Sequence, residues 1–111
     1  MKHLIIISTF LMTLASPIGA QNFKKGIKAY QAGDYTTAIM EWRPLAMTGN
    51  SGAQFLLGAT YEYGHGNMQD YREAAKWYRQ AAEQGHASAQ YYIGLLYESG
   101  RGIIQDNTRA Y

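Results

Sequence analysis

The chain has 111 residues, enough for one domain of modest size, and carries 10 Lys and Arg against 8 Asp and Glu. A balance this close to neutral, without a clustered basic stripe, argues against a nucleic-acid-binding protein. The sequence contains no cysteine, which excludes disulfides, thiolate catalysis, zinc-thiolate sites and lipid attachment through cysteine. Ten tyrosines and two tryptophans indicate packing by large aromatic side chains.

The first 20 residues differ in composition from the rest of the chain. A basic start at Lys2 precedes an apolar run from Leu4 to Ala15, and Ala20 offers a small residue for cleavage. The apolar run is shorter than the roughly 20 residues that a membrane-spanning helix needs. We therefore expect a signal peptide over residues 1–20 and a periplasmic or secreted mature chain that starts near Gln21 and has no membrane contact. A retained membrane anchor is the alternative.

Five amphipathic helices are predicted after this segment, each from apolar residues at spacings of three and four. They cover residues 22–31, 35–47, 51–63, 71–84 and 87–99. Polar N-caps are expected at Asp34, Asn50 and Asp70, and helix-ending glycines at Gly33, Gly49 and Gly85. Asp70 and Glu73 form a capping-box pattern, in which each side chain bonds the backbone of the other.

The predicted helix over residues 51–63 has two different faces. One face contains small residues that permit close approach of the partner helix. Its members are Ala53, Leu57, Gly58 and Tyr61. The other face is left for a neighbouring surface or a ligand. Its members are Phe55, Ala59 and Glu62. We expect Gly58→Leu and the matching Gly94→Leu to destabilise the fold by overpacking, whereas Phe55→Ala should cost little.

The segment from Ser51 to Gly85 recurs from Ala87 with a spacing of 36 residues. At this spacing Gly49, for example, corresponds to Gly85. Such self-similarity is typical of stacked repeats, in which no unit buries its own apolar face alone. The chain divides into repeats at about residues 22–49, 50–85 and 86–111, the first divergent and the last incomplete. We expect a fragment or a truncated reading frame, with self-association through the incomplete repeat as one consequence.

The spaced residues of these repeats resemble a known family. The matching positions are residues 53–61, Gly64-His65-Gly66, Asp70, Ala74-Ala75, Trp77-Tyr78, Ala81-Ala82 and Gln84-Gly85, with Ala89, Gln90, Gly94, Tyr97, Gly100, Gly102 and Asp106 in the next unit. This pattern closely resembles the Sel1-like repeat, a longer-looped relative of the tetratricopeptide repeat. The resemblance covers about residues 22–111. It implies an all-α, right-handed solenoid of antiparallel helix pairs, used mainly as an adaptor surface for other proteins.

Some secreted relatives in this family carry a cysteine pair in each repeat and have been linked to binding or hydrolysing β-lactams. This chain has neither the cysteines nor a Ser-x-x-Lys nucleophile pattern. A β-lactam-related hydrolase is therefore kept only as an alternative function, and the resemblance favours a protein that is not an enzyme.

Catalytic and cofactor motifs are not expected in the repeats. The glycine-rich loops at residues 64–66 and 100–102 follow helices rather than strands, so they serve backbone geometry and not phosphate binding. His86 has no second ligand at metal-binding spacing. Glu62 and Glu98 are equivalent positions, and repeated positions more often share a structural or contact role than an acid–base one. We expect no catalytic residue, cofactor or metal.

The first helices of the pairs are expected to line the inner curve of the solenoid and to form a strip that binds another protein or peptide. The predicted site residues are Phe23, Ile27, Tyr30, Phe55, Ala59, Glu62, Tyr91, Leu95 and Glu98. The strip would be apolar with an acidic edge, suited to apolar anchors and a basic residue.

Two alternatives to this strip remain open. In the first alternative, Phe23 and Ile27 pack on the neighbouring repeat, because so short a superhelix has little curvature. In the second, the protein binds cell-envelope glycan, and Phe55, Tyr63 and Tyr91 stack on sugar rings.

Overall fold

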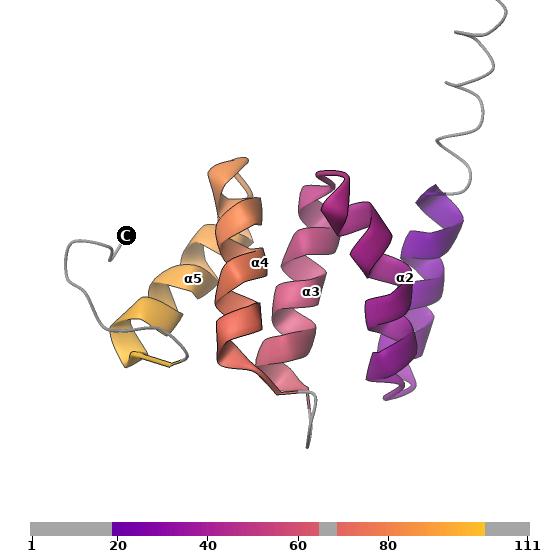
Figure 1. Cartoon of the computed structure of the whole chain (residues 1–111), viewed down its shortest axis with the longest axis horizontal. Coiled ribbons are helices and arrows are strands. Elements are labelled where there is room, and N and C mark those ends of the chain that lie inside the picture. Colours follow the sequence, from indigo (N-terminus) through magenta and orange to yellow (C-terminus); the bar gives the residue numbers. More distant parts are fainter. Residues whose placement is uncertain (1–18, 65–68, 102–111) are drawn as a thin grey trace, which may run out of the picture.

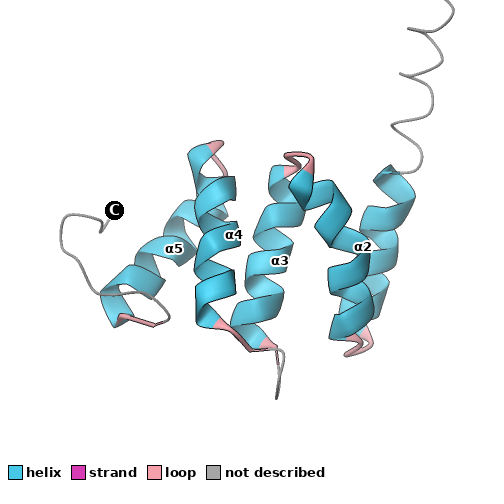
Figure 2. Ribbon diagram, in the orientation of Figure 1, coloured by secondary structure: helices cyan, strands magenta, loops and turns pink. Residues whose placement is uncertain are grey.

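The computed structural model describes residues 19–64 and 69–101, and within these ranges every regular element is a helix (Figure 2). An N-terminal helix covers residues 19–31. It is followed by α2 (Tyr35–Met47), α3 (Ser51–Tyr63), α4 (Tyr71–Glu83) and α5 (Ala87–Ser99). The predicted all-α fold is confirmed. Residues 1–18 of the predicted signal peptide, His65 and Gly66 of the first glycine loop, and residues 102–111 of the third repeat lie outside the described residues.

The helices stand side by side in chain order, from the N-terminal helix at one end to α5 at the other (Figure 1). Neighbouring helices run in opposite directions, and short turns join the N-terminal helix to α2, α2 to α3, and α4 to α5. This arrangement is the helical repeat solenoid expected from the periodic sequence. None of the helices in the described ranges is long and apolar enough to cross a membrane.

The predicted helix ends are largely confirmed. Asp34 and Asn50 accept hydrogen bonds from backbone N–H groups of the helices that they precede. Gly49 and Gly85 have φ values of 101° and 90°, a left-handed conformation that residues with a Cβ rarely adopt. His86 acts as an additional N-cap, because its ring nitrogen accepts from the backbone of Ala89.

The capping box at the start of α4 forms only in part. The Asp70 carboxylate accepts from the backbone N–H groups of Arg72 and Glu73. The reciprocal bond is absent, because the backbone N–H of Asp70 donates to the carbonyl of Tyr61 at 2.8 Å. The Glu73 carboxylate instead lies 3.8 Å from the amine of Lys76. The hydrogen bond from the Asp70 backbone to α3 therefore replaces the predicted bond to the Glu73 side chain.

The core consists of two clusters that meet along α3 and α4. The first contains Ala38, Ile39, Trp42, Ala46, Ala53, Leu57 and Trp77. The second contains Ala74, Ala75, Tyr78, Ala81, Ala89, Ile93, Leu96 and Tyr97. Adjacent residues of α4 enter different clusters, Trp77 the first and Tyr78 the second. A single helix thus stabilises the packing on both of its sides.

The predicted close approach at Gly58 is confirmed. A Cβ placed on Gly58 would lie 2.5 Å from a ring carbon of Tyr78, a distance that real side chains do not tolerate. The described residues do not reproduce this close approach at Gly94. No atom of theirs lies within 4 Å of a Cβ placed there. Overpacking at Gly94 is therefore not expected from the described part of the fold.

Candidate functional site

The candidate site is a groove between α3 and α5. Its walls are the C-terminal end of α3, the second half of α5 and the residue that follows the turn after α5. The lining residues are Glu62, Tyr63, Leu95, Leu96, Glu98, Ser99 and Arg101. The groove has a volume of about 450 Å³, within the range of pockets that take small ligands or groups of side chains.

An aromatic cluster around Tyr92 holds α3 against α5. The Tyr92 ring lies 5.7 Å from Phe55 of α3 and 5.8 Å from Tyr78 of α4. His86 stacks on Phe55 at 4.8 Å. Tilted and offset contacts at these separations are favourable between aromatic rings. The groove walls are therefore positioned by packed side chains of three helices.

Three large apolar side chains remain exposed beside this groove. Their exposed fractions are 51% for Tyr63, 63% for Tyr91 and 39% for Leu95. The rings of Tyr63 and Tyr91 lie 6.5 and 5.4 Å from the ring of Tyr92. Clustered apolar groups of this kind typically mark a surface that contacts another molecule.

Charged groups of both signs border the groove. Glu62 and Glu98 contribute carboxylates, and Arg101 contributes a guanidinium. The guanidinium lies 5.5 Å from the centre of the Tyr71 ring, a cation–π geometry. Burial raises the pKa of Tyr63, and the nearby Glu62 carboxylate raises it further. Tyr63 is therefore a neutral hydroxyl at physiological pH, able to donate a hydrogen bond.

The prediction that Glu62 lies on an exposed acidic edge is wrong. Glu62 is only 6% exposed. Its carboxylate accepts a hydrogen bond of 2.7 Å from the hydroxyl of Tyr78. This pairing satisfies a charge that would otherwise be costly to bury. The exposed carboxylate of the predicted edge is Glu98.

The three predicted site residues of the N-terminal helix pack against α2. The rings of Phe23 and Tyr30 lie 6.5 and 6.1 Å from the ring of Trp42. The Trp42 indole N–H donates to the carbonyl of Phe23 at 3.1 Å. Ile27 packs against the same core cluster. All three are half-buried and contact their own paired helix, so the exposed strip does not extend along them.

Phe55 and Ala59 are also half-buried, because they pack against the second core cluster. Phe55 contacts the rings of Tyr78, His86 and Tyr92. The expectation that Phe55→Ala would cost little is therefore wrong. Of the nine predicted residues, Leu95 and Glu98 lie exposed at the groove, and Tyr91 is exposed one turn before Leu95.

Sequence reasoning did not place Ser99 and Arg101 at the site. Arg101 was interpreted only as part of a glycine turn. Gly100 adopts the left-handed conformation with φ of 70°, and Arg101 then lines the groove. A glycine followed by a charged residue at a helix end is the signal that could have indicated this placement.

Metal ions are held in proteins by clusters of His, Cys, Asp and Glu side chains. No group of three or more such side chains in the described part of the chain could hold a metal ion.

The sequence profile of the Sel1 repeat matches residues 51–86 and 87–111, which is more than half of the chain. A comparison with proteins of curated function gave no match. The first and divergent repeat lies outside the two matched segments.

The solved structures similar to this chain include two Sel1-like repeat proteins. A protective antigen of uropathogenic Escherichia coli strains, which displays an SLR fold, is 32% identical with a TM-score of 0.70. That match covers 79% of this chain and 20% of the antigen. A Sel1 repeat protein from Oxalobacter formigenes is 38% identical with a TM-score of 0.66, over 80% of this chain and 36% of that protein. The chain therefore spans only a fifth to about a third of the length of these relatives.

Proposed function

The chain belongs to the Sel1 repeat family, and we propose that it is a non-enzymatic scaffold of the bacterial cell envelope that binds another protein through the groove between α3 and α5. Sel1 repeats generally mediate interactions between proteins. The observation that carries the proposal is the exposure of Tyr63, Tyr91 and Leu95 beside one groove, whereas the other large apolar side chains of α3, α4 and α5 are buried or half-buried.

The groove fits a protein segment with an apolar anchor and a polar flank. Tyr63 and Leu95 offer apolar surface, and exposed aromatic residues commonly dominate such contacts. Glu98 and Arg101 place opposite charges at its border. These charges would fix the orientation of a bound segment more than they would increase its affinity.

Export to the envelope is the second part of the proposal. It rests on the basic start, the short apolar run and the small residue at Ala20 within residues 1–20. A partner would then be an envelope or secreted protein.

A glycan ligand is the second candidate function. The specific observation that favours it is the pair of exposed rings of Tyr63 and Tyr91, which both contact the ring of Tyr92. Flat aromatic faces with a polar tip can bind sugar rings as well as side chains. Binding to isolated peptidoglycan, measured by sedimentation, distinguishes this candidate from a protein scaffold.

The test of the proposed function is affinity capture from a periplasmic extract with two matched variants. The groove variant combines Tyr63→Ser, Tyr91→Ser and Leu95→Ser. The control combines Met40→Ser and Met47→Ser, which are 67% and 71% exposed on α2 and do not line the groove. We expect a specific protein to be captured by the wild type and the control but not by the groove variant, with all three melting within a few degrees of one another. Equal capture by all three would contradict the proposal.

A further inference from the structure

The N-caps of α3 and α5 have the same geometry but different chemistry. Asn50 and His86 stand 36 residues apart. Their φ and ψ angles are -70° and 110° for Asn50 and -71° and 109° for His86. The Asn50 side chain accepts from the backbone N–H of Ala53 at 2.9 Å, and the His86 ring accepts from that of Ala89 at 3.2 Å. An amide oxygen remains an acceptor as the pH changes, whereas an imidazole nitrogen accepts only while it carries no proton.

The capping bond defines the protonation state of the His86 ring. Nδ1 accepts the Ala89 N–H, so the capping ring is the neutral form with its proton on Nε2. A protonated ring carries N–H groups at both nitrogens and would place a donor against a donor. It would also put a positive charge at the N-terminal end of α5, where the helix macrodipole disfavours cations. The first turn of α5 contains no acidic residue that would offset this charge.

Packing against α3 keeps the ring in the capping position. The His86 ring stacks on Phe55 with the ring centres 4.8 Å apart and an angle of 22° between the planes. A cation–π attraction would favour an imidazolium on Phe55. In this position, however, Nδ1 faces the Ala89 N–H. A charged ring that stays stacked therefore opposes that N–H, and a ring that turns away loses the stacking contact.

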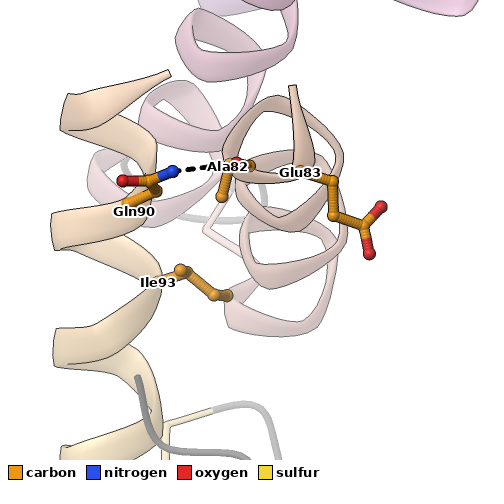
Figure 3. Close-up of a pocket in the computed structure, with 4 residues that line it drawn as sticks. All are labelled: Ala82, Glu83, Gln90 and Ile93. Carbon is orange, nitrogen blue, oxygen red and sulfur yellow. Dashed lines mark hydrogen bonds between the residues drawn. The ribbon is translucent and has the colours of Figure 1, made fainter. Parts of the chain in front are cut away.

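The titratable groups around His86 do not offset a charge on its ring. Glu83 near the end of α4 is exposed, and its side chain points away from α5 (Figure 3). No carboxylate of the described residues forms an ion pair with His86. Tyr78 and Tyr92 contact the same Phe55 ring, and tyrosine hydroxyls are uncharged at neutral and mildly acidic pH. His86 is therefore the member of this cluster that changes charge between about pH 5 and 8.

The aromatic cluster connects His86 to the groove between α3 and α5. The Phe55 ring contacts the rings of His86 and Tyr92, at 4.8 and 5.7 Å. The Tyr92 ring contacts that of Tyr63 at 6.5 Å, and Tyr63 lines the groove. Tyr92 also lies in the second turn of α5, directly after the turn that His86 caps. The cap and the groove wall thus share one set of packed rings.

We propose that His86 is a pH-sensitive cap that opens the first turn of α5 in acid and thereby loosens the groove wall. The neutral ring closes this turn and stacks on Phe55. As the pH falls from about 8 to 5, Nδ1 takes up a proton from water, and the capping bond to Ala89 is lost. Tyr92 then holds α5 less firmly against Tyr63 of α3. The stabilisation by the cap is therefore present where the ring is neutral and absent where it is charged.

A partner bound in the groove would be released in acid. That consequence rests on the proposed function, whereas the switch itself does not. The experiments therefore use the free protein, so that failure of the switch and failure of the groove as a binding surface are separate results.

The first experiment follows thermal unfolding of the full 111-residue protein from about pH 8 to about pH 5. The matched variant is His86→Asn, which copies the cap of α3 and retains every other titratable group. We expect the melting temperature to fall by about 4–8 °C more in the wild type than in His86→Asn, the usual effect of losing one cap in a domain of this size. Parallel profiles of the two proteins would overturn the proposal.

A third protein, His86→Ala, separates the cap from the charge. It has no acceptor at any pH, so it should lack the additional pH dependence and melt below His86→Asn across the whole range. A His86→Ala variant that melts with His86→Asn at about pH 8 would show that position 86 does not cap α5.

NMR spectroscopy of the wild type tests the two ends of the switch. Near pH 8 the side-chain nitrogen shifts of His86 should identify the tautomer with its proton on Nε2. On acidification, the amide signals of Ala89, Tyr92 and Tyr63 should shift together with the titration of the His86 ring, and in His86→Asn they should not. A proton on Nδ1 near pH 8 would overturn the cap. Shifts that affect Ala89 but do not reach Tyr63 would overturn its coupling to the groove.

Discussion

Gly58 and Gly94 occupy the same position in successive repeats, yet their surroundings differ. Gly58 lies under the ring of Tyr78, whereas no described atom approaches a Cβ at Gly94. Both glycines lie inside helices, where the absence of a side chain costs about 1 kcal/mol relative to alanine. At Gly58 this cost is offset by the close approach of a ring, and at Gly94 the described residues provide no such compensation.

Alanine at these two positions should therefore have different effects on stability. We expect Gly58→Ala to lower the free energy of unfolding by about 1–3 kcal/mol through overpacking. Gly94→Ala should leave it unchanged or raise it by up to about 1 kcal/mol through helix propensity. Urea denaturation of the two variants measures both. Equal losses would show that Gly94 is packed as tightly as Gly58.

The hydroxyl of Tyr78 should make stability depend on alkaline pH. Burial raises its pKa above the ordinary value of 10.0, and the hydrogen bond to Glu62 raises it further. The unfolded chain therefore releases this proton at a lower pH than the folded chain does. The contribution of the Tyr78 hydroxyl to the free energy of unfolding is thus complete below pH 10 and is lost as the pH rises above it.

The corresponding variant is Tyr78→Phe, which removes the titrating group. We expect it to be less stable at neutral pH, because the Glu62 carboxylate loses its donor. Above pH 10 the free energy of unfolding should fall less steeply for this variant than for the wild type. The two slopes should differ by up to about 1.4 kcal/mol per pH unit. Parallel pH profiles in thermal unfolding would refute this account of Tyr78.

At the scale of elements, one hydrogen bond recurs between the second helix of a repeat and the first helix of the next. Arg43 of α2 donates to the hydroxyl of Tyr61 in α3. Arg79 of α4 donates to the hydroxyl of Tyr97 in α5 through two nitrogens, at 3.0 and 2.6 Å. Both arginines and both tyrosines are separated by 36 residues. Neighbouring repeats are therefore held together by this polar contact as well as by core packing.

A double-mutant cycle on Arg79→Met and Tyr97→Phe should show a coupling energy of about 1.5 kcal/mol, because the bond is partly buried and charged. The control pair is Lys25 and Glu41, whose charged groups lie 3.8 Å apart with the lysine largely exposed. Its coupling should stay below about 0.5 kcal/mol. Similar couplings in the two pairs would mean that the recurrent bond has no special role in stacking.

The helices and their order could be predicted from the sequence because periodicity, caps and glycines are local signals. The ends of α2, α3 and α5 agree with the predicted ranges, and α4 ends one residue earlier, at Glu83. The functions of the helix faces could not be predicted as well. A helical wheel shows which residues share a face, but not that α3 contacts α2, α4 and α5 at once. Phe55 and Glu62 were therefore placed at a surface when they belong to the packing.

The same limit explains what was missed at the groove. Leu95 and Glu98 were identified because they lie on the first helix of a repeat and away from its core face. Arg101 follows a turn whose direction depends on the backbone of Gly100, which the sequence pattern does not specify.

At the scale of the whole molecule, the N-terminal helix already includes residues 19 and 20, which precede the predicted cleavage site. Cleavage before Gln21 would remove only the first two described residues and leave Phe23 on Trp42. We expect mass spectrometry of protein recovered from the periplasm to show a chain that starts near Gln21. A mature protein that retains Met1 would instead indicate a membrane anchor.

The central claim is that the α3–α5 groove is the surface that contacts a partner. Photo-crosslinking from single positions in living cells tests it most directly. A photoreactive residue replaces Leu95, which lines the groove and is 39% exposed, or Met47, which is 71% exposed on α2. We predict a discrete crosslinked protein from position 95 and none from position 47, although position 47 is the more exposed. The same adduct from both positions, or an adduct from position 47 alone, would contradict the assignment of the groove as the binding surface.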